Sequence, residues 1–221
     1  MKIIFGASGG LGKYIFSHFN SSSQCIGTYK KNKTHEDLVY CDILKLGDCI
    51  NVFKLANKAK NITVINATGH SYNSIFHRAD VDLWKTSLDI NVTGAHNVMR
   101  ASIEYMIGNA GGRIINLSSI VGQIPVAGTS SYSASKSALT GLTRTLAREY
   151  ASRKIFINNL NLGYFDRGMI DLVPSNLKNE IRNAIPVEEF GHPSEIINAI
   201  NWLENSNYVT GTSIDINGGL L

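Results

Sequence analysis

Cysteine is scarce in this chain, and charge of either sign is not clustered. The 221 residues include three cysteines, Cys25, Cys41 and Cys49, and none forms a C-x-x-C pair or lies at zinc-like spacing from a histidine. We therefore expect reduced thiols in a cytoplasmic protein, and no metal site. The 21 basic and 17 acidic side chains are scattered, which excludes the clustered basic patch of a nucleic-acid-binding protein.

Long apolar runs are also missing. No stretch approaches the roughly 18 residues that a membrane-spanning helix needs. The start of the chain, "MKIIFGASGG", lacks the charged region and cleavage site of a signal peptide. We expect a protein that is neither exported nor inserted in a membrane. Its length and its 43% hydrophobic content suit one domain with a substantial core.

Short apolar runs alternate with segments of helical periodicity along the whole chain. The apolar runs lie at 2–5, 24–29, 38–41, 62–67, 112–119, 154–162 and 212–218. The helical segments lie at 12–19, 47–59, 82–106, 133–151 and 193–204. This alternation predicts a doubly wound parallel α/β sheet, a Rossmann fold, in a single domain over residues 1–221. The irregular stretch 163–192 follows a late strand, which is typical of a substrate lid.

A glycine-rich turn, "GASGGLG", follows the first predicted strand and opens a helix. Gly6, Gly9, Gly10 and Gly12 would let the backbone turn tightly and approach a pyrophosphate, whose charge then lies at the helix N-terminus. The spacing differs from the common G-x-G-x-x-G pattern, so a merely structural turn stays open. Within the same turn we also expect cofactor contacts from Ser8 and Leu11.

The end of the second predicted strand bears on the choice of dinucleotide. An acidic residue there would bind the ribose 2′-hydroxyl of NAD. The segment instead reads "GTYKKN", and Lys30 and Lys31 can pair with a 2′-phosphate. The sequence therefore favours NADP(H) over NAD(H), although two solvated lysines at a strand end are the alternative.

Tyr132 and Lys136 lie four residues apart in a helical segment, so they share a helix face. A phenol with a pKa near 10 exchanges protons poorly at neutral pH. A cation about 4 Å away, at an effective dielectric near 20, contributes roughly 4 kcal/mol, or about three pKa units. We therefore expect Lys136 to lower the pKa of Tyr132. Such pairs also arise by chance, but Ser119, at a strand end, adds a hydroxyl for a substrate carbonyl, with Ser118 as the alternative.

Several motifs occur in the order typical of one family. They are "GASGGLG", "CDI", "NATG", "NVTG", "SSIVG", "YSASK" and "YVTGTSIDINGG". Over essentially its whole length the chain resembles the short-chain dehydrogenase/reductase family in its compact form, and within it the 3-oxoacyl-acyl-carrier-protein reductases. The resemblance implies an NAD(P)-dependent enzyme that transfers a hydride between the cofactor and a carbonyl or alcohol.

The resemblance also implies roles for individual residues. Tyr132 would be the general acid, and Lys136 would lower its pKa while binding the nicotinamide ribose. Ser119 would orient the carbonyl. Asn91 would hold a water that links Lys136 to solvent, with a purely structural asparagine as the alternative. The other implied cofactor contacts are Asp42 and Ile43 at the adenine, Asn66, Ala67, Thr68 and Gly69 at the adenosine ribose, and Gly163 and Phe165 after the sixth strand.

The chain departs from the family pattern at several positions. The usual N-N-A-G reads Asn66-Ala67-Thr68-Gly69, which exchanges an amide for a methyl group. Leu162 replaces the proline of Pro-Gly, and Arg167 replaces a threonine near the nicotinamide carboxamide. Arg167 could reach a cofactor phosphate or an anionic substrate instead. Gly9 stands where NADPH-using relatives often have an arginine, which leaves Lys30 as the main argument for NADP(H).

Substrate and partners stay open. Of two basic positions by which such reductases dock the acyl carrier, Arg153 matches one, whereas the other is Ala110. The candidates are a carrier-bound 3-oxoacyl thioester, a small ketone or a sugar. Leu162 and Arg167 keep a second hypothesis open, a catalytically idle dinucleotide-binding sensor or subunit. The resemblance implies a homotetramer or homodimer formed through the two long helices and the last strand.

Overall fold

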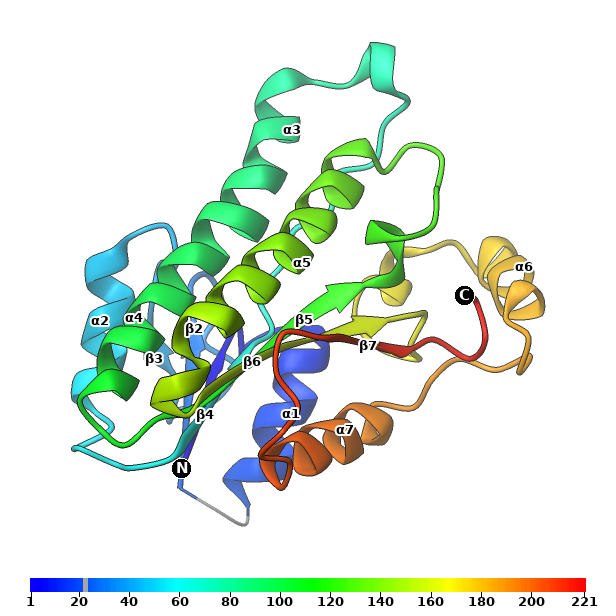
Figure 1. Cartoon of the computed structure of the whole chain (residues 1–221). Coiled ribbons are helices and arrows are strands. Elements are labelled where there is room, and N and C mark those ends of the chain that lie inside the picture. Colours follow the sequence, from blue (N-terminus) through cyan, green and yellow to red (C-terminus); the bar gives the residue numbers. More distant parts are fainter. Residues whose placement is uncertain (22–23) are drawn as a thin grey trace.

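The computed structural model describes residues 1–21 and 24–221, and it is built around one parallel sheet (Figure 1). The seven strands are ordered β3-β2-β1-β4-β5-β6-β7. Their bounds are β1 (Lys2–Phe5), β2 (Cys25–Tyr29), β3 (Val39–Tyr40), β4 (Ile62–Asn66), β5 (Gly112–Ser119), β6 (Ile155–Leu162) and β7 (Ser213–Ile216). Each strand falls in one of the predicted apolar runs, so the predicted doubly wound α/β fold is confirmed.

Helices cover both faces of the sheet (Figure 1). The helices are α1 (Gly10–Asn20), α2 (Leu46–Lys54), α3 (Val81–Leu88), α4 (Ala95–Ile107), α5 (Ser130–Tyr150), α6 (Ser175–Ala184) and α7 (Ser194–Glu204). Short 3₁₀ turns are η1 (Phe76–Arg78), η3 (Ile120–Gly122), η4 (Ala151–Arg153) and η5 (Met169–Leu172), and η2 (Asp89–Gly94) is a π-helical segment. Within the described residues no helix is long and apolar enough to cross a membrane.

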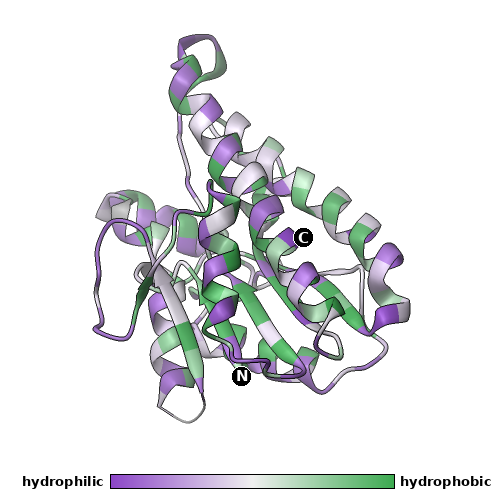
Figure 2. Cartoon of the chain, turned by 90° about the vertical axis from the view of Figure 1, so that its left-hand side faces the viewer, coloured by the Kyte–Doolittle hydropathy of each residue, from purple (hydrophilic) through white to green (hydrophobic). Residues whose placement is uncertain are grey.

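The core consists of two layers, one on each face of the sheet. On one face, Val52 of α2, Met99 of α4 and Leu139 of α5 pack against the strands. On the other, Phe16 of α1 and Ile200 of α7 do so. Figure 2 shows the hydrophobic strands enclosed between these helices. Burial on both faces explains why the strands read as continuous apolar runs.

Two helical features were not predicted. The segment 82–106 was expected to be one helix, but η2 separates α3 from α4, and this π-helical segment carries Asn91. Helix α6 lies in the stretch 163–192 that was read as irregular, and its described side chains are not buried. Its apolar residues Leu177, Ile181 and Ala184 do share one helix face, but the other seven residues are polar, so the segment resembles a polar loop.

Candidate active site

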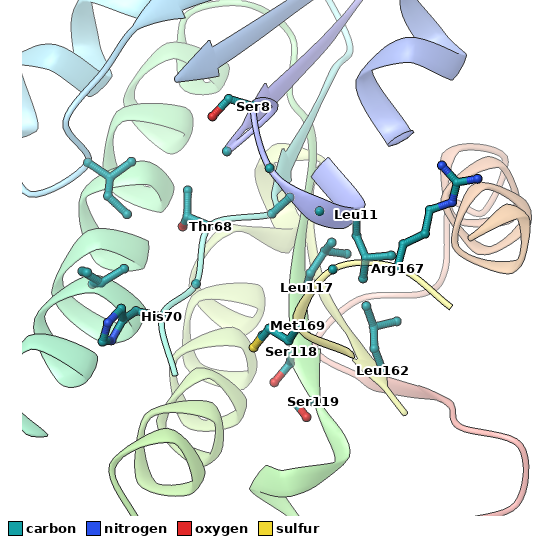
Figure 3. A pocket seen from close by; sticks show the side chains of 18 of the residues that line it. Ser8, Leu11, Thr68, His70, Leu117, Ser118, Ser119, Leu162, Arg167 and Met169 are labelled. Carbon is teal, nitrogen blue, oxygen red and sulfur yellow. The ribbon is translucent and has the colours of Figure 1, made fainter. Parts of the chain in front are cut away.

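A cavity of about 750 Å³ opens at the carboxyl ends of the strands, where the strand order reverses between β1 and β4 (Figure 3). Ligands of doubly wound sheets bind at this switch point. Most of the predicted site residues line it: Gly6, Ser8, Gly9, Gly10, Leu11, Lys30, Asp42, Ile43, Ala67, Thr68, Gly69, Ser119, Tyr132, Lys136, Gly163 and Phe165. Gly12, Asn66 and Asn91 are buried and are not among the residues that line the cavity. His70, Met169 and Ile170 also line the cavity, although no sequence motif indicated them.

The glycine-rich turn is built by close backbone packing. Gly6 has a φ of 81°, which favours glycine, and its N–H donates to the Thr28 hydroxyl at 3.2 Å. A Cβ on Gly12 would lie 2.2 Å from the Gly6 carbonyl oxygen. Gly12 therefore brings α1 against the turn, whereas Gly9 and Gly10 face the cavity.

The Gly12→Ala variant is expected to lose about 1–3 kcal/mol of unfolding free energy, because its methyl group would collide with the Gly6 carbonyl oxygen. Gly47→Ala is the matched control. It makes the same change in the first turn of α2, where a Cβ meets nothing within 4 Å. Urea unfolding followed by circular dichroism measures both. Equal unfolding free energies for the two variants would contradict the close contact between α1 and the turn.

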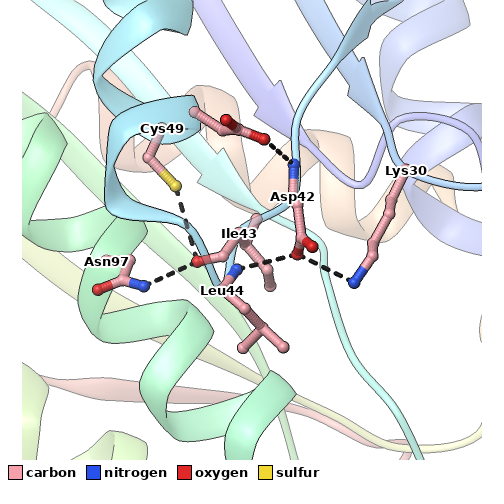
Figure 4. A network of polar contacts seen from close by, with 7 residues as sticks. Lys30, Asp42, Ile43, Leu44, Cys49 and Asn97 are labelled. Atoms are coloured by element: carbon pink, nitrogen blue, oxygen red, sulfur yellow. Dashed lines mark hydrogen bonds and ion pairs between the residues drawn. The ribbon is translucent and has the colours of Figure 1, made fainter.

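Lys30 and Asp42 form an ion pair that the sequence analysis did not foresee (Figure 4). The Lys30 Nζ lies 3.0 Å from the Asp42 Oδ1, which also accepts the Leu44 N–H at 3.1 Å. Burial acts to raise the pKa of the Asp42 carboxyl, but the bonds from Lys30 and Leu44 outweigh it, so the pKa is lowered. The Ile43 carbonyl oxygen accepts the Asn97 amide at 2.9 Å. Contacts from β2 and α4 thus hold the segment after β3 in place.

A row of buried asparagines supports the wall formed by the loop after β4. Asn66, Asn116 and Asn159 are in-register neighbours on β4, β5 and β6, and their side-chain amides are joined at 3.4 and 3.2 Å. The Asn66 Oδ1 also accepts the Thr68 N–H at 3.2 Å and the Thr68 hydroxyl at 2.6 Å. The threonine that departs from the family pattern therefore adds a hydrogen bond to this loop.

Tyr132 and Lys136 come from the first two turns of α5, and Ser119 ends β5. Tyr132 and Lys136 are 7% and 4% exposed, which places both at the buried end of the cavity. The Lys136 Nζ lies 5.5 Å from the centroid of the Tyr132 ring and donates to the Leu117 carbonyl at 2.8 Å. The Ser119 hydroxyl is close enough to Tyr132 to act on the phenol, and it acts to lower the pKa of Tyr132 against the larger effect of burial. Ser118, the alternative to Ser119, also lines the cavity, and its buried hydroxyl has no partner among the described residues.

The expected lowering of the Tyr132 pKa by Lys136 is wrong for this arrangement. Burial raises the pKa of Tyr132 to about 12, and the hydrogen bond from Ser119 offsets only part of that increase. Burial likewise lowers the pKa of Lys136 to about 8. Lys136 would lower the pKa of Tyr132 only if its ammonium lay about 4 Å away in a well-screened medium and both groups kept their hydration. Both groups instead lose hydration on burial, which residue spacing alone does not reveal.

Asn91 uses its whole side-chain amide on buried partners. Its Oδ1 accepts the His70 N–H at 2.8 Å, and its Nδ2 donates to the His70 carbonyl at 2.8 Å and to the Ser135 hydroxyl at 2.9 Å. A Cβ on Gly69 would lie 3.8 Å from both the Asn91 Oδ1 and the Lys136 Nζ. Gly69 therefore lies beside both side chains, and Asn91 holds the loop that carries His70.

The segment after β6 forms the remaining wall. The Gly163 N–H donates to the Ile216 carbonyl at 2.9 Å, and a Cβ on Gly163 would lie 2.7 Å from the Asn217 Cα. The glycine is thus needed even though Leu162 replaces the usual proline. Phe165 is buried and pairs with Gly191, while Met169 lines the cavity. Among the described residues no group of three or more His, Cys, Asp or Glu side chains could hold a metal ion.

Comparisons with known proteins agree with this geometry. A Rossmann-like sheet with a cavity at its switch point is the class of fold that binds dinucleotides. A family model described as "Enoyl-(Acyl carrier protein) reductase" matches residues 15–221. The chain belongs to the short-chain dehydrogenase/reductase family of oxidoreductases, as its motifs predicted.

Named relatives make the resemblance more specific. The chain is 32% identical to the 3-oxoacyl-[acyl-carrier-protein] reductase FabG of Rickettsia conorii, over 100% of this chain and 96% of the relative. It is 31% identical to nodulation protein G of Rhizobium meliloti, over 99% and 95%. The match to FabG of Aquifex aeolicus, at 33% identity, covers 71% of this chain and 64% of that protein. The predicted resemblance to 3-oxoacyl-acyl-carrier-protein reductases is confirmed.

A solved structure shares the fold. A crystal structure described as a gluconate dehydrogenase from Agrobacterium tumefaciens superposes with a TM-score of 0.90. It covers 100% of this chain and 95% of that one at 21% sequence identity. At this identity the similarity extends to the fold alone.

Proposed function

We propose that this chain is an NADP(H)-dependent reductase that transfers a hydride between the nicotinamide cofactor and a carbonyl or alcohol substrate. One observation carries the proposal. Tyr132, Lys136 and Ser119 line the same cavity as the glycine-rich turn, so a dinucleotide lying on the turn would extend toward these three side chains. Hydrogen-bonding groups at one end and a phosphate-binding turn at the other suit a dinucleotide with a small substrate beside it.

The proposed mechanism assigns the proton to Tyr132. The dihydronicotinamide, when bound, supplies the hydride. Ser119 donates a hydrogen bond to the substrate carbonyl oxygen, and Tyr132 protonates this oxygen as it becomes an alkoxide. The raised pKa of Tyr132, about 12, keeps the phenol protonated at neutral pH. An alkoxide is more basic than a phenolate, so the proton moves downhill in the direction of reduction. The Lys136 ammonium, 5.5 Å from the Tyr132 ring centroid, attracts the phenolate that remains, although burial outweighs this attraction in the net pKa of Tyr132.

Two lysines support the choice of NADP(H). Lys30 and Lys31 line the cavity at the end of β2, where a dinucleotide would place its adenosine ribose. Lys30 is paired with Asp42, and a 2′-phosphate would bring a second anionic partner to the same ammonium. With no acidic residue at this strand end, the 2′-hydroxyl of NAD lacks its usual acceptor.

For the substrate we propose a 3-oxoacyl thioester first, with a small ketone or sugar as the alternatives. The names of the relatives support the thioester. Arg153 precedes β6 at the amino end of the sheet, whereas the cavity lies at the carboxyl end. Seven steps along β6 at about 3.3 Å each put roughly 23 Å between these ends. An acyl carrier docked at Arg153 would therefore have to deliver its acyl group to a cavity at the opposite end of β6.

The remaining proposals concern the setting of the site. We propose that the segment 163–192 is the substrate lid, since Met169 and Ile170 of η5 line the cavity. We also keep the proposals of a homotetramer or homodimer and of a cytoplasmic location, which size-exclusion chromatography with light scattering and cell fractionation would test.

Spectrophotometric assays of NADPH oxidation test the proposed function. We expect turnover with an acetoacetyl thioester or with members of a panel of ketones and sugars, and at least about tenfold lower kcat/KM with NADH, since a charge-assisted phosphate contact is worth about 1.5–3 kcal/mol. Tight NADPH binding without turnover of any carbonyl would contradict the proposal and favour the idle sensor or subunit. Equal use of NADH would contradict the cofactor preference alone.

A further inference from the structure

The segment that follows β6 folds back onto the glycine-rich turn. Gly168 and Gly10 both have a positive φ, 91° and 43°, and a Cβ on Gly10 would lie 3.1 Å from the Gly168 Cα. A Cβ on Gly168 would lie 3.7 Å from the Leu11 backbone nitrogen. Gly168 is therefore packed against the turn, and Arg167 is the residue that precedes it.

Among the residues that the structure describes, Arg167 makes two weak side-chain contacts. Its guanidinium carbon lies 5.3 Å from the centroid of the Tyr14 ring on α1, and its Nε lies 3.9 Å from the Asp166 Oδ1. The side chain is 56% exposed. Figure 3 shows it beside Leu11 and directed away from Ser118 and Ser119. An exposed cation over an aromatic ring and a long ion pair bind less strongly than a charge-assisted hydrogen bond, so the guanidinium is free to exchange them.

The charges around the cavity indicate which ligand would replace the contacts of Arg167 with Tyr14 and Asp166. The described lining residues include the basic side chains of Lys30, Lys31, Lys136 and Arg167. Lys30 is paired with Asp42 after β3, and Lys136 is buried beside Tyr132. Arg167 alone of these four follows β6 and adjoins the turn. A dinucleotide lying on the turn brings two negative charges to the N-terminus of α1, where the helix dipole and backbone N–H groups are the other attractive elements.

We propose that Arg167 is a pyrophosphate ligand that moves from the Tyr14 ring to the cofactor when a dinucleotide binds. The inference rests on the proposed function, because it assumes a dinucleotide in the cavity. The guanidinium can donate two parallel hydrogen bonds to phosphate oxygens, a geometry that lysine lacks. Arg167 then recognises the phosphates shared by NADPH and NADH, and it neither contacts the substrate nor discriminates between the two cofactors.

Isothermal titration calorimetry of the full chain with cofactor fragments tests this. The probes are ADP-ribose, which has the pyrophosphate, and adenosine 2′-monophosphate, which has no phosphate at the 5′ position. For Arg167→Met we expect about 10- to 100-fold weaker binding of ADP-ribose and NADPH, with unchanged binding of the monophosphate. Added salt should weaken ADP-ribose binding less in the variant than in the wild type. Arg167→Lys should restore part of the affinity.

The control is Arg78→Met, an exposed arginine in η1 that does not line the cavity. It should bind every probe as the wild type does. If Arg167→Met binds ADP-ribose as tightly as the wild type, the inference is overturned. It is also overturned if only the KM of the carbonyl substrate rises, since Arg167 would then bind an anionic substrate. A wild-type chain that binds no dinucleotide overturns the proposed function, a distinct result.

Discussion

Tyr132→Phe is expected to reduce NADPH-dependent carbonyl reduction by a factor of about 10² to 10⁴, the usual contribution of a general acid, while NADPH binds with unchanged affinity. The ring is buried, and phenylalanine occupies the same space without the hydroxyl. The change removes the proton donor and leaves the rest of the ring in place. Steady-state kinetics and a fluorescence titration with NADPH measure the two quantities separately.

Tyr105→Phe provides the matched control. Its hydroxyl donates to the Ala59 carbonyl at 3.1 Å, and Tyr105 does not line the cavity. The same chemical change there should leave kcat within about twofold and cost about 0.5–1.5 kcal/mol of stability, the typical contribution of one hydrogen bond. Full activity of Tyr132→Phe would remove this phenol from the mechanism. The hydroxyls of Ser118 and Ser119 would then be the remaining candidates for the proton donor.

Lys136→Met is expected to lower kcat/KM by about 10²-fold or more and to make the unfolding free energy less dependent on pH. Loss of the ammonium removes the group that stabilises the Tyr132 phenolate. The same ammonium is costly to bury, because its pKa falls from 10.5 to about 8 in the folded chain. This difference is equivalent to roughly 3 kcal/mol, and the lost hydrogen bond to the Leu117 carbonyl offsets about 1–3 kcal/mol of the gain.

The direction of the pH effect follows from the lowered pKa. Between about pH 8 and 10.5 the unfolded chain binds a proton at Lys136 that the folded chain has released, so stability rises with pH. Below about pH 8 the full cost of the buried charge is present. Urea unfolding at pH 7 and at pH 10 should therefore show a larger increase for the wild type than for Lys136→Met.

An exposed lysine serves as the comparison for this measurement. Lys54→Met, at the end of α2, should keep the increase in unfolding free energy seen in the wild type. If Lys136→Met shows the same increase as Lys54→Met, the buried ammonium does not destabilise the fold, and the low pKa of Lys136 would be contradicted.

Most of the sheet could be predicted from the sequence because its strands are buried on both faces. The run 112–119 coincides with β5, and 154–162 extends one residue beyond β6. The π-helical segment could not be predicted in this way. Its sequence continues the helical pattern of α3 and α4, whereas the side chain of Asn91 bonds to His70 in another loop. Gly94 ends η2, and a Cβ there would lie 2.5 Å from the Ile43 side chain. This close contact with a residue distant in sequence is a tertiary feature.

The candidate site divides in a similar way. The turn of glycines and the four-residue spacing of Tyr132 and Lys136 are local features, so the residues alone indicated a phosphate turn and a shared helix face. Contacts between distant segments could not be read from the residues. They include the pairing of Lys30 with Asp42 and the stacking of Arg167 on Tyr14.

The order of residues along the chain thus accounts for the fold class, the family and the side chains gathered at the carboxyl ends of the strands. The folded arrangement accounts for how those side chains behave. Lys136 donates to the Leu117 carbonyl, and both Lys136 and Tyr132 lose hydration on burial. The pKa of Tyr132 is therefore raised and that of Lys136 is lowered. Periodicity and spacing depend on neighbouring residues, whereas hydration and charge pairing depend on which distant segments pack together.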